Sequence, residues 1–210
     1  MAPALTIQPL HSIPQKHLAL ELLFQINRIE RKTFPASEAF DFSDQSLWRQ
    51  KPNTRILFAT VVPDDKSTST PTPTPTTTTT APKNVKTPKK DSKTATPLPP
   101  SSTTVVVIAY ALYVRQRDTA LLHKICVSEP FRGQGVGKQL LEYVIEQQLR
   151  RQESGCLAVQ LWVDEKREVA RRLYGSCGFV EVEGVEDYYG PGRKGVRMVL
   201  GLEGGMRDEG

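Results

Sequence analysis

The sequence predicts an α/β protein with a mixed central sheet of about six or seven strands and helices that flank it. Short apolar runs rich in β-branched residues recur along the chain, and segments with helical periodicity lie between them. A glycine-rich loop leads from one such run, residues 125–127, directly into an amphipathic helix that begins near Val136. A second unit of strand, helix and strand follows over residues 158–182. Such alternation is typical of layered α/β domains.

The N-terminal part is predicted to form a strand over residues 4–10 and then a helix. Ser12, followed by Pro14, is typical of a helix start. Apolar residues then recur at helical spacing to about Arg31. Pro35 ends this helix, because proline restricts the backbone of the residue before it.

Residues 43–50 fit a short second helix, and residues 54–62 fit a strand. The nearly continuous apolar run at residues 105–114 is typical of a strand in the middle of a sheet, and residues 120–127 form the next strand. We expect the strands at 54–62 and 105–114 to pair with each other as a hairpin.

The segment between these paired strands, residues 63–104, is rich in Thr, Pro, Lys and Ser and has no aromatic residue. Such a segment buries too little apolar surface to offset the loss of chain entropy, so we expect a disordered loop. Because it separates two strands that should pair, it is an insert within one domain over residues 1–210. The fold tolerates such an insert because closure entropy grows slowly with loop length. Its role is open among a neutral expansion, a regulatory loop for phosphorylation and a basic tether. Residues 201–210 are predicted to be a flexible tail.

The positive charge of the chain is concentrated in this insert. Residues 66–104 carry six lysines and one aspartate, which leaves 22 basic and 22 acidic residues elsewhere. A neutral remainder argues against a broad nucleic-acid-binding face on the domain. The three cysteines lack the spacing of a metal site or a disulfide, which favours a reducing compartment, the cytoplasm or the nucleus. No apolar run is long enough to cross a membrane, and no secretory signal is evident.

The C-terminal part is predicted to begin with a strand at residues 158–163, parallel to the strand that enters the glycine loop. A helix over residues 165–177 follows, and Gly178 caps its end. One face of that helix should carry its apolar residues: Val169, Ala170, Leu173 and Tyr174. Residues 179–182 and 195–200 are the last two strands.

The glycine loop is a predicted anion site. Free N–H groups and the dipole of a helix N-terminus favour negative charge there, and glycines let a phosphate approach the backbone. The ATP-binding P-loop does not fit, because Gln139 stands where Ser or Thr is needed and Arg132 where the first glycine is needed. A dinucleotide loop does not fit either, because Gly133, Gly135 and Gly137 have the wrong spacing.

The pattern Arg132, Gly135, Gly137 resembles the acetyl-CoA pyrophosphate loop of the Gcn5-related N-acetyltransferase (GNAT) family, written Q/R-x-x-G-x-G/A. Residues 173–179 resemble the L-Y-x-x-x-G-F signature of the same family, in the expected order along the chain. The resemblance covers most of the chain outside the insert. It implies the GNAT fold, in which the sheet splays open between two parallel strands.

The resemblance also implies the chemistry, namely direct attack of a neutral amine on the thioester of acetyl-CoA within a ternary complex. The loop amides would hold the pyrophosphate, and the splayed strand edge would bind the pantetheine amides. The expected cofactor-binding residues are Ile125, Cys126, Val127, Arg132, Gly133, Gln134, Gly135, Val136, Gly137 and Lys138.

Catalytic roles follow from the same resemblance. Tyr174 is the expected acid, because a phenol with a pKa of about 10 is protonated at neutral pH. His123 is the leading candidate for the base. Trp162 stands where several N-terminal acetyltransferases carry His or Glu, and Arg167 or a neighbour replaces the family's usual Asn. Three carboxylates therefore stay open as alternative bases: Glu30, Glu38 and Asp164.

The acceptor groove is expected at two further segments. Phe34-Pro35 and Tyr188-Tyr189 resemble the substrate loop and the hairpin of ribosomal-protein and other protein N-terminal acetyltransferases. A tyrosine suits such a groove because its ring packs while its hydroxyl reaches a carbonyl. These segments favour the α-amine of a protein or peptide as acceptor. The alternatives are a small amine, such as an arylalkylamine or a polyamine, and a catalytically weak acetyl-CoA-binding adaptor. The sequence identifies no auxiliary subunit.

Overall fold

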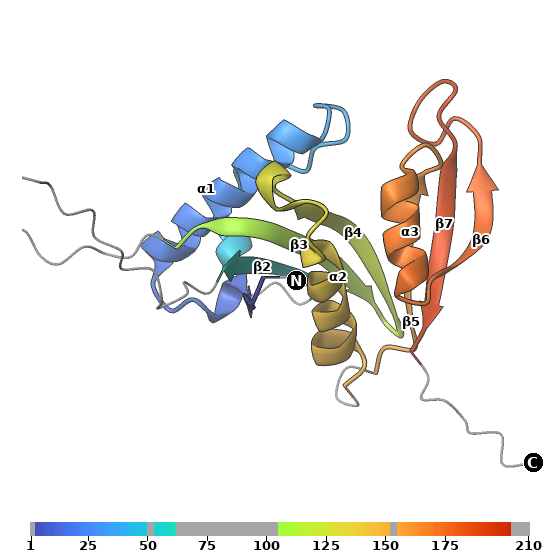
Figure 1. The fold of residues 1–210 in the computed structure, drawn as a ribbon. Helices are drawn as coiled ribbons and strands as arrows, with labels where there is room; N and C mark the ends of the chain where they lie inside the picture. The colour runs from blue at the N-terminus through green and yellow to red at the C-terminus, as the bar shows by residue number, and fades with distance from the viewer. Residues whose placement is uncertain (1–2, 50–52, 62–104, 152–154, 203–210) are drawn as a thin grey trace, which may run out of the picture. The chain divides into compact units, whose positions relative to one another are not determined.

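The structure, a computed structural model, describes residues 3–49, 53–61, 105–151 and 155–202 (Figure 1). The insert predicted at 63–104 lies outside these residues, as does most of the predicted tail. Gly201 and Leu202 are the exceptions, because Gly201 ends the last strand and Leu202 is buried. The N–H of Leu202 also donates to the carbonyl of Leu157 at 2.7 Å. The ordered chain therefore extends two residues into the segment predicted to be flexible.

Seven strands of the described residues form one mixed sheet, which confirms the predicted class (Figure 1). Their order across the sheet is β1-β2-β3-β4-β5-β7-β6. The β4/β5 pair is parallel and every other neighbouring pair is antiparallel. The pairing of β2 with β3 confirms that the strands on either side of the insert form a hairpin. The bounds are β1 Leu5–Pro9, β2 Thr54–Val61, β3 Val107–Gln116, β4 Thr119–Val127, β5 Ala158–Asp164, β6 Val180–Val185 and β7 Gly195–Gly201.

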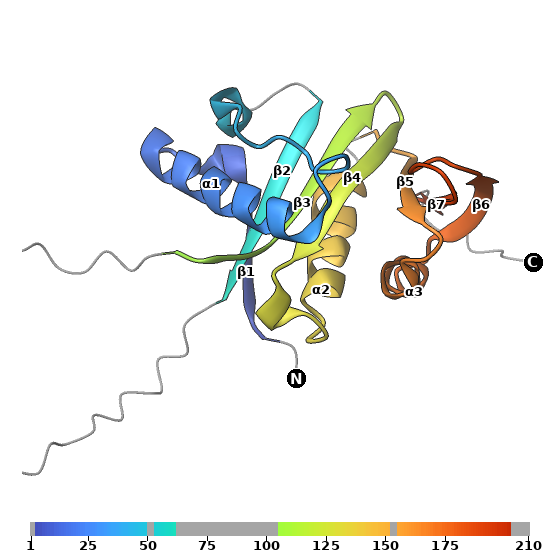
Figure 2. The ribbon, with the colours of Figure 1, turned by 90° about the horizontal axis from the view of Figure 1, so that it is seen from above.

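Within the described ranges, three α-helices cover the two faces of this sheet: α1 (Lys16–Thr33), α2 (Val136–Tyr143) and α3 (Glu168–Ser176). Figure 2 shows α1 on one face, with α2 and α3 on the other. A π-helical turn, Val144–Leu149, continues α2. None of the helices in the described ranges has both the length and the hydropathy of a membrane-spanning segment.

Strand β3, which lies inside the sheet, separates two hydrophobic cores. Tyr110 and Leu112 belong to the core beneath α1, whereas Ala109 and Ala111 belong to the core that holds α2 and α3. Alternate residues of a strand point to opposite faces, so burial on both faces explains the nearly continuous apolar run. The helix that follows the glycine loop is amphipathic as predicted, because six apolar residues on one side of it are buried: Val136, Leu140, Leu141, Val144, Ile145 and Leu149.

Two local predictions are wrong. Ser12 does not cap α1, because its hydroxyl donates to the carbonyl of Pro9 at 2.7 Å and α1 begins at Lys16. The helix predicted at 43–50 is only a 3₁₀ turn, Gln45–Trp48. The carboxylate of Asp44 accepts hydrogen bonds from both the N–H and the hydroxyl of Ser46 and so caps this turn, which the extended backbone of Arg49 ends after four residues.

The predicted apolar face of α3 is also narrower than expected. Tyr174 is buried, but the side chain of Val169 is 76% exposed. Val169 lies in the first turn of α3 and lines the groove beside the glycine loop. Gly178 ends the helix as predicted, with φ 89°, and the N–H of Phe179 donates to the carbonyl of Tyr174 at 3.1 Å.

Candidate active site

The two parallel strands pair over only three residues each. In β4 these are residues 119–121, and in β5 they are residues 158–160. Beyond this point β4 follows β3 as far as Val127, and β5 follows β7 as far as Asp164. The facing edges therefore diverge, and backbone groups of β4 that would bond to β5 are available to a ligand.

The glycine loop stands at the end of β4. Gly133 and Gly135 have φ values of 73° and 80°, the left-handed region that favours glycine. Gly135 is also the N-cap of α2, so the first N–H groups of the helix follow directly. Gly137 differs, because a Cβ atom there would lie 3.4 Å from Leu173 and 3.5 Å from Val127, which is ordinary contact.

A groove of about 660 Å³ runs along this loop and the end of β4. Most of the residues predicted to bind the cofactor line it: Ile125, Cys126, Val127, Arg132, Gly133, Gly135, Val136, Gly137 and Lys138. Gln134 does not line it, and its side-chain amide donates to the carbonyl of Pro130 at 2.9 Å. The shape and the free N–H groups suit an elongated ligand with a phosphate group.

The guanidinium of Arg132 is bonded within the protein and is not a free positive charge in the groove. Its guanidinium donates to the carbonyl of Val127 at 2.9 Å and to the hydroxyl of Thr33 at 3.1 Å. The same hydroxyl contacts the thiol of Cys126 at 3.3 Å. Arg132 therefore fastens the glycine loop to the end of α1. Burial raises the pKa of the Cys126 thiol, which keeps it protonated and makes it a packing residue here.

A second hollow of about 340 Å³ opens on the other side of the splay. Four residues line both spaces: Phe34, Ile125, Arg167 and Ala170. The groove and the hollow therefore meet between the diverging strands. A donor held in the groove could reach an acceptor held in the hollow at this point.

Tyr174 lines the second hollow from α3. It is buried, and its ring lies 5.9 Å from that of Phe179, measured between centroids. Burial raises the pKa of Tyr174 to about 12, although the charge of Arg167 opposes the shift. The hydroxyl is therefore protonated throughout the neutral range and can give a proton.

His123 lies at an irregularity of β4 and lines the same hollow. Leu112 pairs with Lys124 and Tyr113 pairs with Leu122, so His123 is the extra residue of a β-bulge. Bulges re-aim side chains and are frequent next to active sites. Desolvation, and then the charge of Lys124, lower the pKa of His123 below its usual value. Its imidazole is therefore neutral at physiological pH and can accept a proton.

Glu30 and Lys124 form a buried anchor rather than a catalytic pair. The Glu30 carboxylate accepts hydrogen bonds from the Tyr110 hydroxyl and, at 2.7 Å, from the N–H of Phe40. Lys124 lies 3.2 Å from Glu30 and also donates to the carbonyl of Glu38 at 2.6 Å. Its ammonium lies 4.0 Å from the centroid of the Phe34 ring. These contacts fix the substrate loop after α1, and they leave Glu30 unsuited to act as a base.

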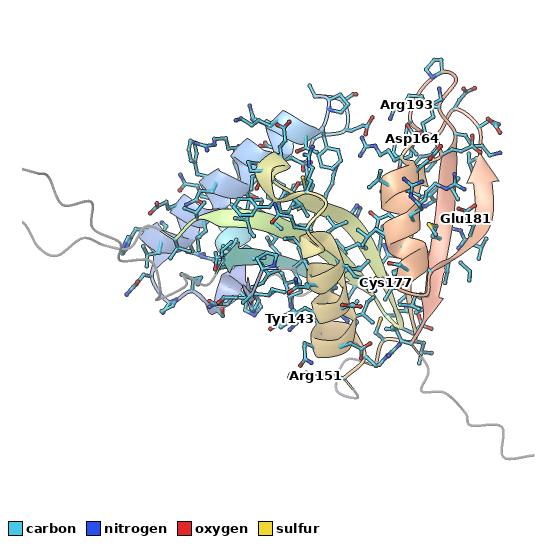
Figure 3. All side chains as sticks on the ribbon, in the orientation of Figure 1. Tyr143, Arg151, Asp164, Cys177, Glu181 and Arg193 are labelled. Carbon is cyan, nitrogen blue, oxygen red and sulfur yellow. The ribbon has the colours of Figure 1, made fainter. Side chains whose placement is uncertain are left out.

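Glu38 and Asp164 are also engaged. Glu38 pairs with Arg167 at 2.9 Å and with Arg193, and Asp164 pairs with Arg193 at 2.6 Å. Burial would raise the pKa of Asp164, but the N–H of Lys166 and the Arg193 guanidinium outweigh it and lower that pKa. Neither carboxylate is free to take a proton. Figure 3 shows Asp164 and Arg193 pointing toward each other at one end of α3.

These ion pairs join three segments around the mouth of the second hollow. Glu38 comes from the substrate loop, Arg167 from the start of α3, and Arg193 from the β6–β7 hairpin. Glu38 could be predicted as a site residue from the sequence, whereas Lys124 and Arg193 were missed. The one available signal for Arg193 was its place just after the tyrosine pair.

Aromatic rings form one wall of this hollow. Trp162 stacks on Tyr188 with 4.3 Å between centroids, and Tyr188 meets Tyr189 edge-on at 4.9 Å. Phe34 lines the hollow as well. Pro35 does not line it; its carbonyl instead accepts hydrogen bonds at 2.9 Å from the N–H groups of the two residues at 38 and 39. Within the described ranges, no three His, Cys, Asp or Glu side chains gather in a metal-binding arrangement.

Comparison with known proteins agrees with this geometry. The sequence pattern of the acetyltransferase (GNAT) family matches residues 90–179. The N-alpha-acetyltransferase MAK3 of Arabidopsis thaliana is 30% identical over 86 residues, which cover 41% of this chain and 44% of that protein. The [ribosomal protein bS18]-alanine N-acetyltransferase of Haemophilus ducreyi is 32% identical over 83 residues, which cover 40% of this chain and 55% of that protein.

A solved structure extends the likeness to the whole fold. The crystal structure of Arabidopsis thaliana NAA60 in complex with acetyl-CoA superposes with a TM-score of 0.61, over 96% of this chain and 100% of that one. The sequence identity is 15%, so this comparison bears on the fold. The matched segments span about half the length of the two relatives found by sequence.

Proposed function

We propose that the chain, in which residues 90–179 match the acetyltransferase (GNAT) family, transfers the acetyl group of acetyl-CoA to a primary amine. The acceptor we propose is the α-amine of a protein or peptide. The observation that carries the proposal is the meeting of two spaces at the splay, one beside the glycine loop and one lined by Tyr174, Tyr188 and Tyr189. The two N-terminal acetyltransferases that match by sequence support the choice of acceptor.

The groove fits acetyl-CoA, which would supply an acetyl group already activated as a thioester. The N–H groups at Gly133, Gly135 and the start of α2 are placed for the pyrophosphate. Backbone groups of residues 125–127, which have no partner on β5, are placed for the amides of the pantetheine arm. Lys138 at the rim adds positive charge. Arg132 acts indirectly, by holding the loop in position.

Two residues would move the protons. Tyr174 would protonate the leaving thiolate, since its raised pKa keeps the hydroxyl protonated at neutral pH. His123 would take the proton of the attacking amine, directly or through water, since its lowered pKa keeps it neutral. Of the candidate bases in the described site, His123 has neither an ion pair nor a buried anchor role.

One observation favours a second candidate, a small amine. The pairs of Glu38 with Arg167 and Arg193 link the substrate loop to the opposite wall of the second hollow. If these links persist, we expect them to hinder a peptide more than a small acceptor. Phe34 and the tyrosine pair contact either kind of acceptor.

The test is the release of coenzyme A from acetyl-CoA in the presence of N-terminal peptides, lysine peptides, polyamines and arylalkylamines. Turnover with N-terminal peptides supports the proposal, and turnover with small amines alone replaces it by the second candidate. Calorimetry with acetyl-CoA separates a failure of acceptor choice from a failure of cofactor binding. Binding without turnover on any amine would instead indicate a catalytically weak adaptor.

A further inference from the structure

One wall of the acceptor hollow depends on a residue that has no side chain. In the β5–β7 ladder Trp162 lies opposite Arg197, and Asp164 lies opposite Gly195. Residues two apart on a strand share a face of the sheet, so these four positions form a square on one face. Three corners carry side chains, those of Trp162, Arg197 and Asp164, and the corner at Gly195 carries none.

The ring of Tyr188 fills that corner. A Cβ atom on Gly195 would lie 2.7 Å from Cγ of Tyr188 and 2.8 Å from its Cβ and Cδ1 atoms. From this position the ring stacks on Trp162, with an angle of 12° between the ring planes. Trp162 is the diagonal neighbour of Gly195 in the ladder, a distance that aromatic side chains bridge in antiparallel pairs.

The backbone of Gly195 does not itself require glycine, because it lies outside the left-handed region. The requirement comes from the hairpin that presents Tyr188. Asp187, just before it, has φ 56°, and its carboxylate accepts a hydrogen bond from the N–H of Gly192 at 2.6 Å. That hydrogen bond supports a backbone conformation that L-residues rarely adopt. The hairpin thereby directs Tyr188 onto the empty corner.

We propose that Gly195 is a positioning and specificity-determining residue for the acceptor. The missing side chain lets Tyr188 lie flat on the ladder, and the stacked pair of Tyr188 and Trp162 then forms an aromatic wall. Asp164 at the neighbouring corner is already paired with Arg193, so the wall offers apolar surface. The acceptor class that fits it is an amine with an apolar group beside it. The kinetic part of this inference rests on the proposed function, whereas the part about the stack does not.

The hairpin offers a matched control in Gly184. A Cβ atom there would also be too close to a neighbour, at 2.6 Å, but that neighbour is Cε of Lys194, near the flexible end of its side chain. Lys194 can move away at little cost. Tyr188 cannot, because the atoms in contact are its own Cβ and Cγ, so the whole ring must leave Trp162. Gly195→Ala and Gly184→Ala therefore add the same methyl group, but only Gly195→Ala should displace an aromatic ring.

The experiment compares Gly195→Ala, Gly184→Ala, Tyr188→Gly and the double variant Gly195→Ala/Tyr188→Gly in the full chain. The first readout is the fluorescence of Trp162, assigned with Trp162→Phe, together with the midpoint of chemical unfolding. We expect Gly195→Ala to alter the Trp162 emission and lower the midpoint, and Gly184→Ala to change neither. We expect the effect of Gly195→Ala on the midpoint to disappear once position 188 is Gly, because both the ring and the Cβ atom of Tyr188 are then absent.

The second readout is kinetic, with two peptides that differ only in a Leu or a Gly as first residue. We expect Gly195→Ala to raise KM for the Leu peptide at least tenfold, to raise that for the Gly peptide less, and to leave KM for acetyl-CoA within twofold. An unchanged Trp162 emission in Gly195→Ala, or an equal loss of stability with and without the Tyr188 ring, would overturn the inference. If no amine is acetylated, the proposed function fails, and the fluorescence and unfolding data still decide whether Gly195 positions Tyr188.

Discussion

Tyr174→Phe is the sharpest test of the catalytic assignment, because it removes one oxygen atom and keeps the ring. Tyr174 packs near Phe179 in the core and turns its hydroxyl side to the second hollow. Within the part of the chain that the structure describes, the Tyr174 hydroxyl makes no hydrogen bond. We therefore expect the free energy of unfolding to change by less than about 1 kcal/mol, the net worth of a typical hydrogen bond.

The expected effect on catalysis is much larger. A positioned general acid contributes about 10²–10⁴-fold to a rate. At about 1.36 kcal/mol for each factor of ten, this corresponds to about 2.7–5.4 kcal/mol of transition-state stabilisation. The loss should appear in kcat, while KM for acetyl-CoA changes little, because the hydroxyl is needed only as the thiolate departs.

Tyr113→Phe is the matched control. Tyr113 is also buried, and burial raises its pKa to about 12 as well. It lies in β3 and lines neither the groove nor the second hollow. The two variants therefore make the same chemical change in the same core, and only Tyr174→Phe should slow turnover.

The assay is the initial rate of coenzyme A release at saturating acetyl-CoA, together with the unfolding curve of each variant. Since the pKa of Tyr174 is about 12, its hydroxyl stays protonated and the rate should not fall as the pH rises from 7 to about 10. A Tyr174→Phe variant that keeps the wild-type kcat would refute the proton-donor role. Equal losses in both variants would show that the effect is structural.

Three further changes probe the rest of the site. The pKa of His123 is lowered, so the kcat/KM of the wild type should decline only below a pH of about 6.5. His123→Gln should remove this decline at low pH. A decline that persists in the variant would show that another group causes it. Glu38→Gln should raise KM for the acceptor several-fold without changing KM for acetyl-CoA, because it weakens the pair with Arg193 that holds the substrate loop; equal shifts in both KM values would argue against this. Gly135→Ala places a Cβ at φ 80°, which costs about 1–2 kcal/mol and should weaken acetyl-CoA binding measured by calorimetry. Gly137→Ala should bind normally, and equal weakening would contradict the conformational argument.

Local elements were predictable where a short pattern determines them. The helix after the glycine loop follows from the 3.6-residue period of its apolar residues, all of which are buried. Gly178 could be predicted as a helix end because that position needs φ > 0. The same reasoning was wrong at Ser12, whose hydroxyl donates to the carbonyl of Pro9 and caps no helix, and at residues 43–50, where the turn capped by Asp44 ends at the extended Arg49.

The two catalytic candidates could be named from the sequence, but their surroundings could not. Tyr174 and His123 both line the second hollow, and their catalytic roles remain a prediction. The bulge that makes His123 an extra residue of β4 has no local signal, because it exists only relative to the register of β3. The ion pairs of the carboxylates proposed as alternative bases could not be predicted from the sequence either. Glu38 and Arg193 are brought together from 155 positions apart.

The sequence by itself determined the α/β class, the glycine loop, the apolar helix after it and the family resemblance, because each depends on neighbours a few residues away. The tertiary structure decided which strands diverge, which charges neutralise one another and why position 195 carries no side chain. Those properties depend on register and on atoms from distant segments. Trp162, Tyr188 and Gly195 form one wall only after β5, β7 and their hairpin have met.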